Sequence, residues 1–221
     1  MTDGGLEIGD YAWREGREAM LRVGPADGPV VVAVPALFEE ANRTRALLVA
    51  VLRRLAAGGI GGALPDLPGQ NESLVPTEAA RLTDWRAAFA AAVAALGRPA
   101  HVLAVRGGAL VDLEAEVASR WYLAPLSGEA QVRELQRLRA AGGGGDYAGN
   151  GIHDVMMAEL ADAEPAILPP LRVTRLVADP RPADVTFPAA PPWRASEPRS
   201  DAALAAAIAA DIATWVAGCD G

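Results

Sequence analysis

Three apolar runs, each followed by residues at helical spacing, constrain the fold of this 221-residue chain more than any other feature. The runs occupy residues 30–34, 60–64 and 101–105. Apolar runs that lack polar alternation are typical of strands buried on both faces of a parallel sheet. Strand–helix units of about 30–40 residues with right-handed connections predict a doubly wound α/β fold. We therefore expect one domain with a mostly parallel sheet and helices on both faces.

The segments between and after these runs carry the helical pattern. Gly58 and Gly59 should end the first helix, and Thr77 can cap the second. A third helix is expected to follow Gly107 and Gly108. The apolar stripes that define these three helices are Leu47, Leu48, Val51, Leu52 and Leu55; Leu82, Trp85, Phe89, Val93 and Leu96; and Leu110, Leu113 and Val117.

The two ends of the chain are less regular. A hairpin over residues 11–23 should form an antiparallel edge of the sheet. The Gly-rich residues 142–145 read as a flexible connection and the Pro-rich residues 180–198 as an irregular segment. The other expected elements are strands over 121–125 and 171–178 and helices over 128–141, 153–163 and 201–217.

Composition excludes several classes of function. The net charge is −8 and all 20 basic residues are arginines. An acidic chain without lysine is a poor candidate for binding nucleic acid or an anionic membrane, and it excludes a lysine Schiff base. A single Cys219 and two histidines argue against disulfides and against a multi-histidine metal site. We expect no cofactor, no metal, no membrane insertion and a soluble, cytoplasmic protein.

The turn after the third run has the layout of a nucleophile elbow without its nucleophile. Small residues at Ala104 and Gly108 flank a central position, as in the pattern Gly-x-Ser-x-Gly. Arg106 occupies that position. A guanidinium with a pKa above about 12 is neither a nucleophile nor a base. Asp179 can fill the acid position, but no histidine follows it in the chain.

The chain resembles the exosortase A system-associated hydrolase 2 family, which has the α/β-hydrolase fold. Residues 35–45 carry the most distinctive likeness, with Glu39, Glu40, Asn42 and Arg43 in a Glu-Glu-x-Asn-Arg block. The other similar segments are 64–69, 105–110, 125–128, 135–139 and 192–197. The resemblance implies a three-layer α/β-hydrolase-like fold with a reduced cap, and association with exosortase, PEP-CTERM sorting and exopolysaccharide production. The sequence departs from the family pattern at Gln70 and Asn71 and is trimmed between Ser73 and Thr77.

The candidate site gathers polar residues that follow the strands, because ligands of open parallel sheets bind at that edge. We expect Arg106 to pair directly with Glu40 or Glu39. The alternative for the block is a charged first helical turn in which Glu39 pairs with Arg43. The residues expected to line the site are Glu39, Glu40, Asn42, Arg43, Asp66, Arg106 and Trp193.

Several candidates also have plain structural interpretations. Asp66 can be a turn former, and Trp193 can anchor an irregular segment or, with Glu197, close over the site. His101 should face the remote end of its strand, and His153 should lie on the surface.

Two functions remain open from the sequence. The first is a non-catalytic or catalytically altered protein that binds a small molecule or a protein of the exosortase and polysaccharide system, with no catalytic residue. The second is an active ester-type hydrolase that uses Ser73, or Asp66 with a water molecule. Fold likeness cannot decide between them.

Overall fold

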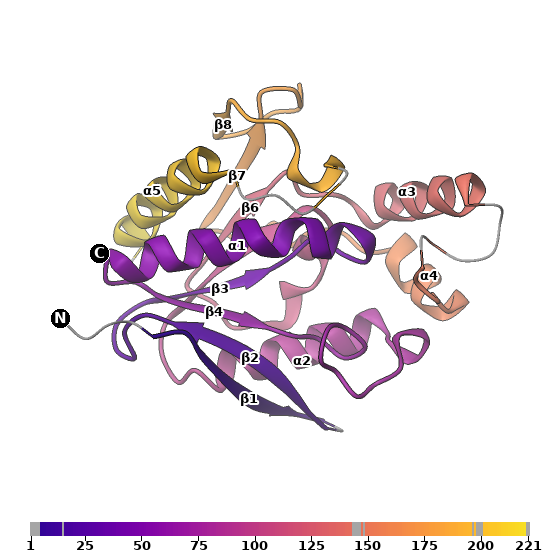
Figure 1. The fold of residues 1–221 in the computed structure, drawn as a ribbon, viewed down its shortest axis with the longest axis horizontal. Coiled ribbons are helices and arrows are strands. Elements are labelled where there is room, and N and C mark those ends of the chain that lie inside the picture. The colour runs from indigo at the N-terminus through magenta and orange to yellow at the C-terminus, as the bar shows by residue number, and fades with distance from the viewer. Residues whose placement is uncertain are drawn as a thin grey trace.

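An eight-stranded sheet lies between helical layers in the computed structural model, which describes residues 5–14, 16–142, 147, 149–195, 197 and 201–219 (Figure 1). The strand order is β1-β2-β4-β3-β5-β6-β7-β8. The pairs β1–β2 and β2–β4 are antiparallel, and the other pairs are parallel. The predicted three-layer, mostly parallel α/β architecture is confirmed. The strands are β1 (Glu7–Trp13), β2 (Gly16–Val23), β3 (Val30–Val34), β4 (Gly61–Pro65), β5 (Ala100–Val105), β6 (Ser119–Leu123), β7 (Leu171–Leu176) and β8 (Val185–Phe187).

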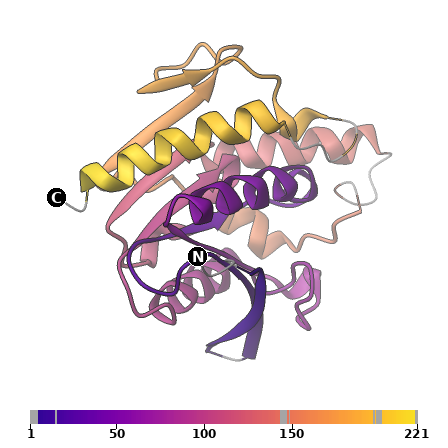
Figure 2. The same ribbon diagram turned by 60° about the vertical axis from the view of Figure 1, so that its left-hand side comes forward.

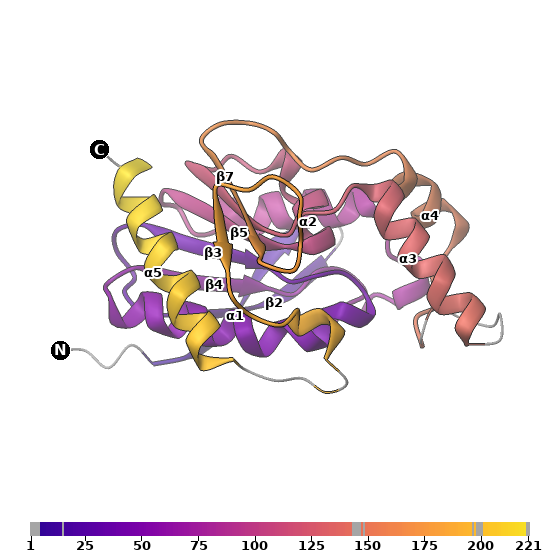
Figure 3. The same ribbon diagram turned by 90° about the horizontal axis from the view of Figure 1, so that it is seen from above.

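The helices divide between the two faces and one edge of the sheet. α1 (Glu39–Ala57) and α5 (Ala202–Cys219) lie side by side on one face (Figure 2). α2 (Leu82–Ala94) packs on the opposite face. α3 (Gly128–Ala141) and α4 (Asp154–Ala161) lie beyond the carboxyl ends of the strands (Figure 3). These two helices therefore stand over the edge where the candidate site is expected.

The central strand β3 shows why an unbroken apolar run forms a buried strand. All five of its residues are buried. Val32 belongs to the core that contains Trp85 of α2, whereas Val31 belongs to the core that contains Leu52 of α1. Because successive side chains point to opposite faces, both faces of the strand need apolar residues.

The segment after β5 differs from the prediction. The chain forms two short 3-10 helices, Arg106–Leu110 and Asp112–Glu114, in place of the expected α-helix. Two consecutive glycines lower the helix propensity here. The buried carboxylate of Asp112 also accepts hydrogen bonds from Arg120 Nε (2.8 Å) and Tyr122 Oη (2.8 Å) of β6, which ties the segment to the sheet.

The expected cap of α2 is also wrong. Thr77 begins a separate 3-10 helix, Thr77–Ala79, and its hydroxyl donates to the carbonyl of Gly69. The cap comes from α4, where Glu159 Oε2 accepts from the backbone N–H of Leu82 at 2.7 Å. A long-range carboxylate thus satisfies an N–H that the helix itself leaves unpaired.

The sequence prediction missed β8, which lies within the Pro-rich segment 180–198. Only residues 177–184 connect β7 to β8, and they contain no helix. Arg175 closes this connection by donating from Nε to the carbonyl of Pro182 at 3.0 Å and from Nη1 to Asp179 at 2.9 Å. A 780 Å³ cleft beside β6 and β7 remains where a crossover helix would pack.

The edge hairpin and the remaining helices agree with the sequence. β1 and β2 form the predicted antiparallel hairpin. Within the described part of the chain, α5 alone has the length and hydropathy of a membrane span. It packs against α1 through residues such as Leu204 and Ile208, as a core helix does. The predicted Gly-rich connection spans residues 142–145; Gly142 caps the end of α3, and residues 143–145 lie outside the described residues.

Candidate functional site

Arg106 occupies the crest of a sharp turn between β5 and the following 3-10 helix. Its φ of 55° lies in the left-handed region, which costs about 1–3 kcal/mol for a side chain of this kind. The turn also needs a glycine at position 108, because a Cβ there would lie 2.4 Å from the carbonyl oxygen of Pro35. A Cβ on Gly107 would lie 2.3 Å from Gln131 Oε1, so the Gln131 side chain would have to move. The turn thus has the geometry that was inferred for an elbow, with a guanidinium at its tip.

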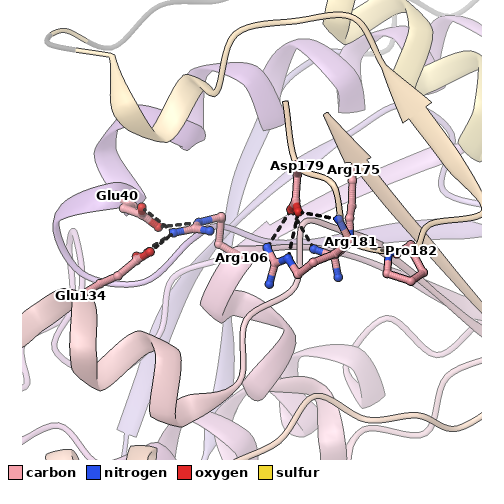
Figure 4. Close-up of polar contacts among 7 residues, drawn as sticks. All are labelled: Glu40, Arg106, Glu134, Arg175, Asp179, Arg181 and Pro182. Atoms are coloured by element: carbon pink, nitrogen blue, oxygen red, sulfur yellow. Dashed lines mark hydrogen bonds and ion pairs between the residues drawn. The ribbon is translucent and has the colours of Figure 1, made fainter. Parts of the chain in front are cut away.

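Two carboxylates hold the guanidinium of Arg106 (Figure 4). Nε donates to Glu40 Oε2 and Nη2 to Glu40 Oε1, both at 3.2 Å. Nη2 also donates to Glu134 at 2.8 and 2.6 Å. The predicted pairing of Arg106 with Glu40 is confirmed. Glu134, which comes from α3, is a partner that the sequence prediction missed.

Trp193 completes this arrangement from the segment that follows β8. Its ring centroid lies 5.0 Å from Arg106 Cζ, within the range of a cation–π interaction. The backbone carbonyl of Trp193 accepts a hydrogen bond from Arg43 Nη1 at 3.0 Å. Arg43 in turn forms an ion pair with Glu39, as the alternative reading of the block proposed. Glu39 therefore neutralises Arg43, and Glu40 is left for Arg106.

The charged groups of this cluster are largely buried, so they affect one another's pKa values. The side chain of Arg106 is 5% exposed and that of Glu40 is 14% exposed. Burial raises the pKa of Glu40, Arg106 opposes the increase, and the negative charges of Glu134 and Glu39 add to it. Arg106 and Glu40 therefore form a buried pair, and Glu134, whose side chain is 32% exposed, adds a second negative charge beside them.

A 430 Å³ cavity, called the Arg106 cavity below, opens at this cluster, between α1, α3 and the segment after β8. Leu37, Phe38 and Leu135 are among its apolar lining residues. Arg137 and Arg194 also line it and are exposed. Of the described residues that line this cavity, none is a serine, threonine, cysteine or histidine. The described part of the lining can bind and orient a ligand, but it contributes no hydroxyl, thiol or imidazole.

Asn42 and Asp66 lie apart from this cavity. Asn42 lines a separate 160 Å³ cavity, with Phe38 common to both. The carboxylate of Asp66 is buried and accepts from Arg45 Nη1 (2.9 Å) and Asn71 Nδ2 (2.8 Å). Asp66 is among the lining residues of neither cavity. The seven candidate residues thus divide, and Glu39, Glu40, Arg43, Arg106 and Trp193 line the larger cavity.

Ser73 is fixed within its own loop. Its Oγ accepts from the backbone N–H groups of Gly69 (2.9 Å) and Val75 (3.1 Å) and donates to Glu18 Oε1 (3.0 Å). Burial raises the pKa of Glu18, and the hydrogen bond with Ser73 opposes the increase. The hydroxyl therefore contacts a carboxylate, and its lone pairs are taken by the backbone.

Asp179 follows β7 at the same edge of the sheet as Arg106, and it is bound by arginines (Figure 4). Arg181 donates to it from Nε at 2.9 Å and from Nη2 at 2.7 Å, and Arg175 donates at 2.9 Å. These hydrogen bonds, with that of Arg181 the largest cause, hold the pKa of Asp179 well below its usual range. The residue in the acid position thus orients arginines instead of an imidazole.

Neither histidine lines the Arg106 cavity. His153 is exposed, lines the smaller cavity and caps α4 by accepting from the backbone N–H of Val155. His101 lies near the opposite end of β5, where its Nδ1 is 2.8 Å from Ser119 Oγ. Both residues of that pair are buried, so a substrate has no access to them. Glu197 is exposed and is not among the lining residues of the Arg106 cavity.

Solved structures similar to this chain share one fold. A haloalkane dehalogenase loop variant from Bradyrhizobium elkanii is 12% identical over 98% of each chain, with a TM-score of 0.65. A thermophilic esterase from Thermogutta terrifontis, with malate bound, is 12% identical over 96% of this chain and 99% of its own, with a TM-score of 0.61. No protein-family model and no curated protein matches the chain. The chain has the α/β-hydrolase fold, and at these identities the likeness establishes the fold alone.

Proposed function

We propose that this protein is a non-catalytic ligand-binding member of the α/β-hydrolase fold that acts in the exosortase A, PEP-CTERM and exopolysaccharide system. One observation carries the first part of the proposal. Arg106 stands at the crest of the elbow and is held there by Glu40, Glu134 and Trp193. The position that would present a nucleophile instead presents a cation that is ion-paired with two carboxylates.

The chemistry of the cavity supports binding over turnover. Nucleophilic catalysis of acyl transfer needs a hydroxyl or thiol beside a base, and the described cavity lining has neither. Gln131 Oε1 also lies against Gly107, the residue after the crest, whose N–H would contribute to an oxyanion hole. An acceptor oxygen beside that hole would repel a developing oxyanion.

The second part of the proposal comes from the resemblance of the Glu-Glu-x-Asn-Arg block to the hydrolase 2 family. Three residues of this block, Glu39, Glu40 and Arg43, line the cavity. A block with three residues in the lining of the cavity is the part of the chain expected to carry a function common to the family. Deletion of the gene should therefore reduce exported polysaccharide, and complementation should restore it. Unchanged export would argue against this association.

An active hydrolase that uses Ser73 is the alternative. The contact between Ser73 and Glu18 is the observation that favours it, because the Ser73 hydroxyl donates to a carboxylate whose pKa is raised by burial and which can act as its base. The two backbone donors on Ser73 Oγ weigh against attack by that oxygen, since its lone pairs are engaged.

A hydrolysis assay separates the two functions. The protein is incubated with a panel of short acyl esters and with a fluorophosphonate probe, next to its Ser73→Ala variant. We expect no turnover above the Ser73→Ala background and no labelling. Turnover or labelling that the substitution abolishes would overturn the non-catalytic proposal.

A further inference from the structure

We infer that the Arg106 cavity takes a small soluble organic oxyanion, a phosphate ester or a carboxylate, that also carries a hydroxyl group. The inference rests on the proposed function and names the chemical class of its ligand. It starts from the charges around the 430 Å³ cavity. Four arginines and three glutamates line it, so its formal charge is +1 when all are ionised, within a chain of net charge −8.

The distribution of ion pairs leaves positive charge at the rim. Glu39 pairs with Arg43, and Glu40 and Glu134 pair with Arg106. Arg137 of α3 and Arg194 of the segment after β8 form no ion pair with any residue in the described ranges. Two exposed guanidinium groups that face one cavity form a site for an anion, because each can donate two parallel hydrogen bonds to an oxyanion.

The floor of the cavity adds one donor. The four hydrogen bonds of Arg106 use Nε and Nη2, and Nη1 donates to no described residue. Nη1 is not among the buried atoms that lack a partner, so it retains access to solvent. A ligand in the cavity can accept a hydrogen bond from it without displacing either carboxylate.

Gln131 supplies an acceptor that requires a donor from the ligand. The residue is 2% exposed and lines the cavity, and its Oε1 has no hydrogen-bond partner in the described structure. A buried acceptor without a donor costs about 1–3 kcal/mol in general. Because this oxygen is enclosed against Gly107, a ligand hydroxyl satisfies it when the Gln131 side chain turns from Gly107 towards the cavity. The cavity therefore favours a ligand that carries a negative charge at its rim and an O–H donor near Gln131.

The test uses titration calorimetry with glucose 1-phosphate, gluconate, glucose and agmatine as probes. Backbone NMR shifts then locate the bound probe. We expect glucose 1-phosphate or gluconate to bind and to shift residues around Arg106 and Gln131, whereas neutral glucose and cationic agmatine bind at least about tenfold more weakly. The Arg137→Ala/Arg194→Ala double variant should weaken binding of the anion by about tenfold or more.

A matched control is Arg53→Ala, which removes one exposed arginine of α1 that lines none of the described cavities. It should bind the anion as the original chain does. The inference would be overturned if glucose bound as tightly as the anions, if agmatine bound more tightly than they do, or if neither anion bound. It would also be overturned if the double variant bound the anion as tightly as the original chain. Cosedimentation with phosphatidylinositol vesicles, without binding of a soluble anion, would overturn it in favour of a lipid headgroup.

These outcomes do not decide whether the protein is catalytic. Failure of anion binding together with absence of ester turnover removes the ligand class and leaves the non-catalytic proposal standing. Ester turnover that Ser73→Ala abolishes removes the non-catalytic proposal, whatever the cavity binds.

Discussion

Trp193 lies over the guanidinium of Arg106, with 5.0 Å between its ring centroid and Arg106 Cζ. Trp193 is 5% exposed, and its carbonyl also accepts from Arg43. Trp193, in the segment after β8, thus connects the elbow to the first turns of α1. In a fold whose active members present an imidazole in this part of the chain order, an aromatic ring covers a cation instead.

Substitutions of Trp193 should lower the free energy of unfolding by an amount that depends on how much of the ring they remove. We expect Trp193→Ala to reduce the free energy of unfolding by about 3–5 kcal/mol, because it removes a large buried side chain. Trp193→Phe should cost less, since it keeps an aromatic face over Arg106. Urea unfolding followed by circular dichroism measures both. Equal losses for the two variants would mean that the ring face contributes nothing.

Removing the charge of Arg106 should be more harmful than removing the whole ion cluster. Arg106→Met leaves Glu40 and Glu134 without their shared partner, and breaking such a buried pair costs about 3–5 kcal/mol. The triple variant Arg106→Met/Glu40→Gln/Glu134→Gln removes the uncompensated carboxylates as well, so it should recover most of that loss. Urea unfolding curves compare the three proteins. A triple variant as unstable as Arg106→Met would contradict the role assigned to the charges.

A methyl group on Gly108 should not fit the elbow. Its Cβ would lie 2.4 Å from Pro35 O and 2.9 Å from Val34 O, both of which are backbone atoms that cannot turn away. We expect Gly108→Ala to cost about 1–3 kcal/mol or more. Gly9→Ala is the control, because no atom lies within 4 Å of its added Cβ. Thermal unfolding midpoints report the difference, and equal midpoints would show that the turn can relax.

Asp179 should make stability depend on acidic pH. The arginines hold its pKa below the ordinary 3.8, so the ionised carboxylate stabilises the fold above that pH. This contribution is lost as the pH falls through the lower pKa of the folded state. Asp179→Asn should therefore be less stable than the original chain at pH 7, and the gap should narrow towards about pH 2. Urea midpoints across this range measure it.

The control for this pH series is Glu72→Gln, which changes an exposed carboxylate that has no ion pair within the described residues. Its stability difference from the original chain should stay small throughout. A constant gap for Asp179→Asn between pH 7 and about pH 2 would refute the assigned linkage.

Local patterns in the sequence were enough to predict most of the sheet and helices. β3 and α3 begin and end where their apolar patterns predict, because burial on fixed faces imposes a period on the residues. The link between Arg106 and Glu40 was also predictable, since both follow neighbouring parallel strands and meet at one edge.

The missed features depend on contacts between distant segments. Glu134 reaches Arg106 only because α3 lies over the strand ends. The residue pattern within α3 gives no signal that distinguishes Glu134 from the other glutamate of this helix. β8 is three residues long among prolines, too short for alternation to indicate a strand. Glu159 caps α2 from 77 residues away, which local capping rules cannot anticipate.

The short connection between β7 and β8 has a consequence for how the outer end of the sheet opens. Phe187 of β8 packs into the core that contains α5, while Thr186 faces outward and is exposed. The hydrogen bonds of this strand are therefore shielded on one side only, and they can open without unfolding of the rest. Amide hydrogens of β8 should exchange with deuterium well before those of the buried central strand β3.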